Sequence, residues 1–369
     1  MKRIGIFQFY SELGVVEEYI EKLLQSMKSI LSRLIIVYNC ELCERELCKL
    51  TQYTEFIYKR QNLGFDAGAY KDVLLNLYHD DWTRWDELVL FNCTFYGPLY
   101  PWEKLFKRME EEVVDFWGLS RHYGKIRLRR NGPVIPEHLQ SYFLVIRNTI
   151  LCSPFWWEYW NELEYPRGYY ETIEKFELKF TAFFRNKGFQ YTSWMDVQGY
   201  RSDFYVNPCT MCTYDLIKDF KFPIVKYKVI SIDNFEEMKK VIEFVDRNLD
   251  YDVELIKNHI KHLNEKSKWR PFSVERLEEF VRSHKHIYIF GHGKFGKSLG
   301  QFFKYKKWKF LAYVVSIPQE QNEIAFSNFY MSDSDGMIVA LEKKAMEEMK
   351  EKIKEKFNDN HLLFPNIIE

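Results

Sequence analysis

The sequence predicts an α/β protein whose core is a mainly parallel sheet flanked by helices. Hydrophobic residues make up 46% and charged residues 29% of its 369 residues, which is typical of a soluble globular chain. Over residues 1 to about 120, short apolar runs alternate with segments in which apolar residues recur at helical spacing. Because such alternation is typical of βαβ units, we expect parallel strands that bind ligands at their carboxyl ends.

The individual elements follow from the same two patterns, taken in chain order. Runs rich in Ile, Val and Phe predict strands, and the amphipathic segments between them predict helices. The expected strands are residues 3–9, 33–38, 54–58, 87–91, 114–119 and 139–146, and the expected helices are residues 15–31, 67–78, 102–113, 155–163 and 171–187. Residues 121–136, rich in Arg, Gly and Pro, interrupt the pattern as a basic loop or hairpin.

The composition changes twice along the chain, and the changes predict three segments. Residues 1–230 hold the expected sheet, residues 231–285 are charged and helical, and a new strand signal starts at His286. We therefore expect a large α/β domain at 1–230, a helical linker at 231–285 and a small Rossmann-like accessory domain at 286–369.

The small domain opens with a glycine motif. Residues 291–296 read G-x-G-x-x-G between a predicted strand and a predicted helix, the context in which such a loop binds phosphates. The next strand ends at Ser316, where dinucleotide-binding folds usually carry an Asp or Glu for the ribose. We interpret the unit as an accessory module, and a dinucleotide-binding enzyme is the alternative.

Charge and cysteine content limit the partners and the compartment. Lys+Arg and Asp+Glu both number 53, so no basic excess favours a nucleic-acid partner. No apolar run approaches the roughly 20 residues of a membrane span, and the N-terminal apolar run is interpreted as a buried strand. Seven cysteines without a secretory signal favour a cytoplasmic location.

The most informative loop lies between the third predicted strand and the helix that follows it. Asn62 and Asp66 offer side-chain hydrogen bonds, and Gly64 allows close approach of the backbone. Free amides at the start of a helix favour an anion such as a diphosphate. A plain strand-to-helix turn with Asp66 as its N-cap is the alternative.

Several blocks of sequence, in a fixed order, point to one family. They are N-x-G-x-D-A-G-A at 62–69, an asparagine strand followed by F-Y-G-P-L at 92–99, V-D-F-W-G-L at 114–119, H-L-Q-S-Y-F at 138–143 and E-L-K-F-T at 177–181. Together they resemble the rhamnan synthesis F family of glycosyltransferases, which make bacterial surface polysaccharides and are related to enzymes of the nucleotide-sugar (GT-A) fold. The resemblance covers roughly residues 1–260 and includes P-I-V-K at 223–226.

The resemblance implies a nucleotide-sugar donor site on the carboxyl edge of the sheet. Residues that end the first strand would hold the base or ribose, and the glycine-asparagine loop would contact the donor. Residues that end the fourth strand would lie where related enzymes hold a metal ion against the diphosphate. The donor-binding residues implied in this way are Phe9, Tyr10, Asn62, Gly64, Asp66, Asn92 and Thr94.

At the metal position the sequence departs from the family pattern. The family commonly has an Asp directly after the asparagine, whereas this chain has Cys93. Because a thiol is a poor ligand for Mg²⁺, we expect little dependence on a divalent cation such as Mg²⁺ or Mn²⁺. Cations of the basic loop would then neutralise the leaving diphosphate, unless that loop is only a solvated hairpin. These cations are Arg127, Arg129 and Arg130.

Glu177 is the predicted general base, which would take the proton of the acceptor hydroxyl in an inverting transfer. It lies 11 residues before Gly188, the spacing that the acidic catalytic motif keeps in related transferases. Glu171 and Glu174 are nearby rivals for this role. The alternative for Glu177 is a surface carboxylate on an amphipathic helix.

The activity that the resemblance implies is transfer of a deoxysugar, rhamnose from dTDP-rhamnose, to a lipid-linked glycan that grows into a surface polysaccharide. His138 and Gln140 are the expected acceptor contacts, and a hydrogen bond to a loop carbonyl is the alternative role for His138. The chain would act in the cytoplasm, at the inner face of the cell membrane. A non-catalytic scaffold of the same fold is the alternative that Cys93 suggests.

Overall fold

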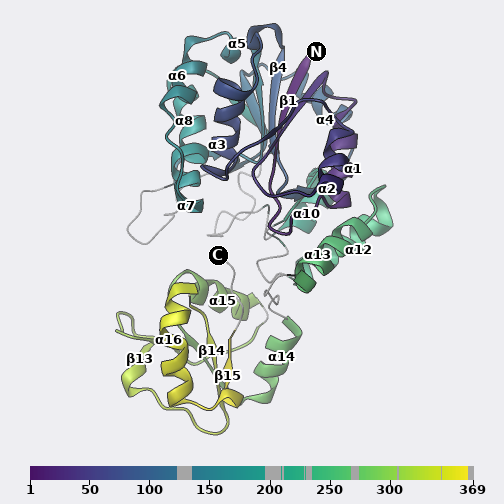
Figure 1. Cartoon of the computed structure of the whole chain (residues 1–369). Helices are drawn as coiled ribbons and strands as arrows, with labels where there is room; N and C mark the ends of the chain where they lie inside the picture. Colours follow the sequence, from purple (N-terminus) through teal and green to yellow (C-terminus); the bar gives the residue numbers. More distant parts are fainter. Residues whose placement is uncertain are drawn as a thin grey trace. The chain divides into compact units, whose positions relative to one another are not determined.

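Two compact units make up the structure, a computed structural model shown in Figure 1. One unit comprises Met1–Val229 and Glu236–Leu263, and the other comprises Ile230–Phe235 and Asn264–Glu369. Each unit has its own sheet and its own hydrophobic core. The structure describes residues 1–122, 135–195, 209, 212–227, 229, 235–266, 274–305, 307–341 and 343–364.

An eight-stranded sheet forms the centre of the first unit. Its strands are β1 (Arg3–Phe9), β2 (Arg33–Tyr38), β3 (Ile57–Lys59), β4 (Glu87–Asn92), β6 (Phe116–His122), β7 (His138–Leu139), β8 (Phe143–Arg147) and β9 (Tyr191–Met195). Their order is β3-β2-β1-β4-β8-β6-β7, with β9 paired to β6. The first four strands run parallel, and β8 is antiparallel to both of its neighbours. The expected α/β fold on a mainly parallel sheet is confirmed.

Helices cover both faces of this sheet (Figure 1). One face carries α3 (Phe65–Asp72), α6 (Pro154–Glu162) and α8 (Leu178–Asn186), and the other carries α1 (Glu18–Met27) and α4 (Trp102–Glu110). Every residue of β1 and of β4 is buried, so both strands need cover on both sides. The shorter helices of this part are α2 (Glu44–Thr51), α5 (Asn148–Leu151) and α7 (Tyr169–Thr172).

Aromatic side chains fill the core between the sheet and the layer of α3, α6 and α8. Trp156 and Trp160 of α6 are fully buried, with their ring centroids 5.5 Å apart. Phe180 of α8 packs edge-on against Phe116 of β6, at 5.9 Å between centroids. Rings of this size supply much of the buried area that stabilises the unit, which accounts for the 18% aromatic content of the chain.

The order of the strands creates a topological switch point between β1 and β4. From β1 the chain moves outward to β2 and β3, and it then returns to β4 on the other side of β1. The loops that leave β1 and β4 therefore diverge, and open α/β sheets bind their ligands at such a switch point.

A two-stranded sheet brings a distant part of the chain to the end of β4. In this sheet β5 (Phe95–Tyr96) pairs antiparallel with β10 (Val225–Lys226), and Lys226 lies opposite Phe95. The backbone N–H of Tyr227 also donates to the carbonyl of Thr94 at 2.9 Å. Lys226 is thereby placed beside Thr94, although 132 residues separate them in sequence.

The segment expected as a linker is divided between the two units. Glu236–Leu263, which holds most of α12 (Phe235–Asn248) and α13 (Glu254–Lys266), belongs to the first unit. These helices bury Val241, Val245 and Ile256, because each has one apolar face. The next helix, α14 (Val274–Ser283), belongs to the second unit.

The second unit is a small Rossmann-like sheet with helices. Its strands are β11 (His286–Phe290), β12 (Tyr313–Val315), β13 (Glu323–Ala325), β14 (Asp335–Val339) and β15 (Leu362–Leu363), and its further helices are α15 (Lys294–Tyr305) and α16 (Lys343–Lys356). The order is β13-β12-β11-β14-β15, and all pairs are parallel. Across the described parts of both units, no helix combines the length and the apolar character that a membrane crossing requires.

The glycine motif of the second unit serves the packing of α15 on β11. Gly291 has a φ of +100°, a left-handed conformation that favours glycine. A Cβ atom on Gly296 would lie 1.9 Å from the carbonyl oxygen of Gly291. The tight turn requires Gly291, and the close approach of the first turn of α15 to that loop requires Gly296. Both requirements hold with or without a ligand.

Candidate active site

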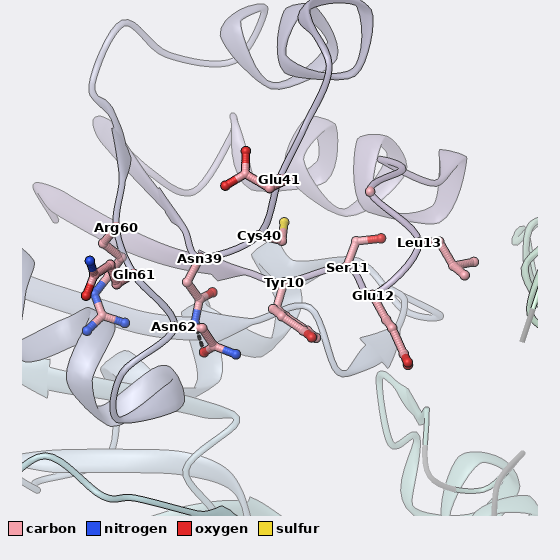
Figure 2. Close-up of a pocket in the computed structure, with 11 residues that line it drawn as sticks. Tyr10, Ser11, Glu12, Leu13, Asn39, Cys40, Glu41, Arg60, Gln61 and Asn62 are labelled. Atoms are coloured by element: carbon pink, nitrogen blue, oxygen red, sulfur yellow. Dashed lines mark hydrogen bonds between the residues drawn. The ribbon is translucent and has the colours of Figure 1, made fainter.

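A pocket of about 570 Å³ lies at the carboxyl ends of β1, β2 and β3. Three loops line it, namely residues 10–14, 39–41 and 60–62 (Figure 2). Tyr10 and Asn62, which the sequence places in the donor site, are among the lining residues. Small-molecule sites typically enclose roughly 300–1,000 Å³, so the pocket has the size of a nucleotide site.

A chain of amide side chains fixes Asn62 in the pocket. Gln8 donates from Nε2 to Oδ1 of Asn39 at 2.7 Å, and Asn39 donates from Nδ2 to Oδ1 of Asn62 at 2.6 Å. Figure 2 shows the two asparagines between Arg60 on one side and Tyr10 on the other. Gln8 is buried on β1, so the inner strand itself orients the polar groups of the pocket.

Arg60 is a lining residue that the sequence analysis did not single out. Its Nε lies 2.6 Å from Oδ2 of Asp72, and its Nη2 donates to the carbonyl of Leu63 at 2.5 Å. Its Nη1 is buried and has no hydrogen-bond partner in the described part of the chain. A buried N–H without a partner costs free energy, and the contacts with Asp72 and Leu63 hold the guanidinium in place beside the pocket.

The predicted donor residues at the ends of β3 and β4 form one hydrogen-bonded set. Asn92 donates from Nδ2 to Oδ2 of Asp66 at 3.1 Å. Its Oδ1 accepts from the backbone N–H of Thr94 at 3.1 Å and from the Thr94 hydroxyl at 2.6 Å. Gly64 caps α3 with a φ of +77°, which brings Asp66 into the first turn of the helix.

Lys226 completes this set. Its Nζ donates to Oγ1 of Thr94 at 3.1 Å and lies 3.6 Å from the ring centroid of Tyr142. Burial lowers the pKa of Lys226 to about 8, and the negative charges of Glu177 and Asp66 oppose part of that fall. The ammonium form therefore still predominates at neutral pH.

Glu177 lies at the same edge and is held on both oxygens. Its Oε2 accepts from the backbone N–H of Ser141 at 3.0 Å and from the Ser141 hydroxyl at 2.8 Å. Its Oε1 lies 3.5 Å from Nε2 of His138. His138 Nδ1 lies 2.8 Å from the carbonyl of Pro136, so that nitrogen carries a proton and Nε2 faces Glu177. His138 thus positions the predicted base.

The two carboxylates of the site have pKa values shifted in opposite directions. Burial raises the pKa of Asp66 to about 6, and the neighbouring charge of Glu177 adds to the rise. Burial would also raise the pKa of Glu177, but the contacts from His138 and Ser141 outweigh it and hold that pKa at about 2. Glu177 is therefore ionised throughout the physiological range, whereas Asp66 titrates close to it.

Gln140, the other expected acceptor contact, is also buried. Its Oε1 accepts from the hydroxyl of Ser120 at 2.7 Å, and Ser120 lies 2.5 Å from the hydroxyl of Tyr142. Residues 140–142 leave the sheet between β7 and β8, and the single strand expected over 139–146 is for this reason two strands. The bend places Ser141 against Glu177 and Tyr142 under Lys226.

The residues at the end of β4 do not fit a divalent cation. The Cys93 thiol contacts the backbone nitrogen and oxygen of Tyr10, both at 3.4 Å, and burial raises its pKa to about 11. Asn92 Oδ1 already accepts two hydrogen bonds, and an ammonium group adjoins Thr94. Mg²⁺ requires several oxygen ligands, and Asp66 is the one carboxylate that the described residues bond to this set.

The remaining predicted residues lie elsewhere. Phe9 is buried against Phe7, at 6.3 Å between ring centroids, and does not line the pocket. Glu171 accepts from the backbone N–H of Arg167 and pairs with Lys175, away from the Asp66 set. The loop that carries the three predicted cations Arg127, Arg129 and Arg130 falls outside the described residues.

The second unit holds a separate polar cluster at its glycine motif. His292 Nδ1 lies 2.6 Å from Oε1 of Glu323, and the ring of His292 stacks on Tyr313 at 3.7 Å. One group in the described part of the chain has its possible ligand atoms within 4.8 Å of one another, as binding of a shared cation requires. It consists of His292, Glu320 and Glu323. Glu323 already accepts from two backbone N–H groups, which accounts for its burial without an ion.

Comparisons with known proteins agree with the sequence blocks. The sequence model of the family "Rhamnan synthesis protein F" matches residues 34–359. The uncharacterized protein y4gN of Sinorhizobium fredii is 27% identical over 193 residues, which is 52% of this chain and 48% of that protein. The chain thus matches about half the length of this curated relative.

Two solved structures were also compared with the chain. The glycosyltransferase GlyE of Streptococcus pneumoniae has 14% identity and a TM-score of 0.33, with 100% of this chain and 92% of that chain covered. The 4-diphosphocytidyl-2C-methyl-D-erythritol synthase of Anaerococcus prevotii has 9% identity and a TM-score of 0.32, with 52% and 88% covered. Scores this low carry no weight for fold or function.

The family model, in contrast, spans most of the chain and both units. The resemblance seen in the ordered sequence blocks is therefore confirmed. The chain belongs to the rhamnan synthesis protein F family.

Proposed function

We propose that this chain transfers rhamnose from dTDP-rhamnose to a lipid-linked glycan that grows into a bacterial surface polysaccharide. Membership of the rhamnan synthesis protein F family supports the class of reaction. The observation that carries the proposal is that the pocket at the ends of β1, β2 and β3 adjoins the hydrogen-bonded set at the end of β4. Tyr10 lines the pocket and contacts Cys93, and Asn62 lies in the loop that leads to Asp66.

This arrangement separates recognition of the nucleotide from the reacting centre. The pocket offers an exposed ring at Tyr10 and the amide of Asn62 to a base, ribose or phosphate, and the side chain of Arg60 lines its wall. The diphosphate and the sugar would extend from there over Asp66 and Thr94. The acceptor hydroxyl would then approach from the side of Glu177.

The proposed reaction is a single displacement with inversion. The acceptor oxygen forms a bond to the anomeric carbon as the bond between that carbon and the diphosphate oxygen breaks. Glu177 takes the proton of the acceptor hydroxyl, and the diphosphate takes the electron pair of the broken bond. A carboxylate with a pKa of about 2 holds a proton only weakly, so proton transfer would accompany the attack rather than precede it.

Binding and transfer measured on the full chain test the proposal. Calorimetry with dTDP-rhamnose, UDP-sugars and GDP-sugars should give one preferred donor, and radiolabelled transfer to a lipid-linked acceptor should follow the same preference. Asn62→Ala should weaken binding, whereas Gln52→Ala, at an exposed position after α2, should not. A chain that binds none of these donors, or transfers none, would contradict the proposal.

A further inference from the structure

The leaving diphosphate needs a positive charge, and the end of β4 does not supply one through a metal ion. As the bond to the anomeric carbon breaks, the diphosphate gains one negative charge, which a cation must stabilise in the transition state. Cys93 is a neutral thiol turned toward Tyr10, and the oxygens of Asn92 and Thr94 are already hydrogen-bonded. A positively charged side chain at the same place would meet the requirement directly.

Lys226 is a cation at that place. Its Nζ reaches Oγ1 of Thr94 at 3.1 Å, directly after the strand that carries Asn92. An ammonium group has three donors, and one face of this one lies over the ring of Tyr142. Among the described residues, no carboxylate oxygen lies within 4.0 Å of Nζ. The hydrogen bond to Thr94 uses one N–H group of the ammonium, and other N–H groups remain for an anion.

The cost of burying this charge indicates a functional reason for it. A buried ammonium without an ion pair is destabilising, and apolar replacements at such positions are often neutral or stabilising. Lys226 keeps its charge beside a hydroxyl and an aromatic face rather than beside a carboxylate partner. An anion of the donor would provide the missing partner.

We propose that Lys226 is a catalytic residue whose ammonium group contacts the leaving diphosphate and replaces the divalent cation at the end of β4. The assignment rests on the proposed function. Lys226 donates hydrogen bonds to the diphosphate oxygens and keeps its proton, while the diphosphate takes the electron pair of the breaking bond. Thr94 positions the ammonium, and Tyr142 covers it.

Kinetics of two substitutions test the role of the charge. Lys226→Met keeps an unbranched side chain one atom shorter, removes the charge and should lower kcat by about 10²–10³-fold, the usual effect of removing one transition-state donor. Lys226→Arg keeps the charge and should restore part of that loss. Lys187→Met is the control for loss of a lysine charge, because Lys187 is exposed, follows the last residue of α8 and pairs with Glu158. A Lys226→Met enzyme with more than about a tenth of the wild-type kcat would overturn the assignment.

Binding of the product dTDP gives a second readout that does not need turnover. The titratable groups that face Lys226 are Asp66, Cys93, Tyr142, Glu177 and Cys209. In the wild type, affinity for dTDP should fall as pH rises through about 8, where the ammonium loses its proton. The Lys226→Arg variant should not show this fall, because guanidinium stays charged. Equal pH profiles for the two proteins would overturn the assignment even if the Met variant failed to fold.

The two proposals can fail separately. A wild type that binds dTDP and transfers sugar with no dependence on Lys226 would overturn this assignment alone. A wild type that binds no nucleotide would overturn the proposed function and this assignment with it. Turnover that EDTA abolishes and Mn²⁺ restores would show that a metal ion supplies the charge, and it would overturn only the role of Lys226.

Discussion

In each unit a strand leads through a glycine-containing loop into a helix, from β3 into α3 in the first unit and from β11 into α15 in the second. In the first, the loop borders a pocket of about 570 Å³, and the polar residues Tyr10 and Asn62 line that pocket. In the second, the polar groups beside the loop bond to each other, as His292 does with Glu323 at 2.6 Å.

The comparison teaches that a glycine loop specifies backbone geometry, and that its neighbours decide whether a ligand is needed. Gly64 and Gly291 both adopt a left-handed conformation, with φ of +77° and +100°. What differs is the surrounding set of side chains. Around the first loop, the opposite charges of Asp66 and Lys226 attract each other without forming an ion pair, whereas Glu323 beside the second loop has a full set of partners.

The largest effect is expected at the base. Glu177→Gln should lower sugar transfer by about 10²–10⁴-fold, because an amide cannot accept a proton, and should leave nucleotide affinity unchanged. Radiolabelled transfer and calorimetry measure the two quantities. Glu171→Gln is the control, since Glu171 pairs with Lys175 and lies outside the site. More than about a tenth of the wild-type rate in the Gln variant would show that another group, with Asp66 the first candidate, is the base.

A substitution in the second unit should change stability without changing nucleotide binding. Gly296→Val would force a side chain against the carbonyl of Gly291 and should destabilise that unit by about 1–3 kcal/mol or more. Calorimetric unfolding should show the loss, while titration with dTDP should give the wild-type affinity. Gly293→Ala is the control, because a Cβ atom there meets nothing within 4 Å. Loss of dTDP affinity in a Gly296→Val protein with an intact first unit would move the donor site to the second unit.

The pH dependence of the free energy of unfolding should reveal the cost of burying the ionised Asp66 carboxylate. Its pKa is about 6 in the folded chain and about 3.9 in an unfolded one, so ionisation costs folded-state stability as pH rises between these values. The cost should reach on the order of 2–3 kcal/mol above pH 6, at about 1.4 kcal/mol per pKa unit. Asp66→Asn should remove this loss in denaturant unfolding at pH 4.5 and 7.5.

Glu177→Gln should change the pH dependence of stability in the opposite direction when it is measured in the same way. With a folded pKa of about 2, Glu177 contributes stability that is present above about pH 4.5 and lost as pH falls toward 2. The Gln variant should therefore be less stable than the wild type near neutral pH and should lose that difference in acid. Identical pH profiles for the wild type and the Asp66→Asn protein would contradict the electrostatic account of the site.

The smallest effect is expected from metal removal. EDTA should change the transfer rate little, because the end of β4 combines a neutral thiol, an ammonium group and one carboxylate. The rate is measured with and without added Mn²⁺ after chelation. A strong dependence on Mn²⁺ would make Asp66 the first ligand to test, by substitution with Asn.

Most of the fold could be predicted because its inner strands have simple patterns. The strands at 3–9 and 33–38 have the predicted bounds, since both are short apolar runs buried by helices. The helix expected over 67–78 begins earlier, at Phe65, because the left-handed Gly64 caps it, and it continues as a π-helix over Val73–Leu77. The short helix α2 and the strands β5, β9 and β10 were not predicted, because segments this short do not give a clear hydrophobic periodicity.

The candidate site could be predicted only where it follows a strand. Asp66, Asn92 and Thr94 were found because the carboxyl ends of parallel strands meet at one edge. Lys226 was noted only within a family block, since a two-residue strand gives no local signal and its position depends on pairing with β5. Arg60 gave no signal either, because its importance lies in a donor left without a partner.

The pairing of β10 with β5 also sets the order in which this site can be completed during synthesis. The residues of the pocket and the hydroxyl of Thr94 leave the ribosome long before Lys226, which follows Thr94 by 132 residues. A nascent chain that ends before β10 would carry the groups that recognise a nucleotide but lack the buried ammonium. Closing so long a loop is slow compared with forming the local βαβ units. The charge that we assign to catalysis is therefore the last part of the site to be added, after the part that binds.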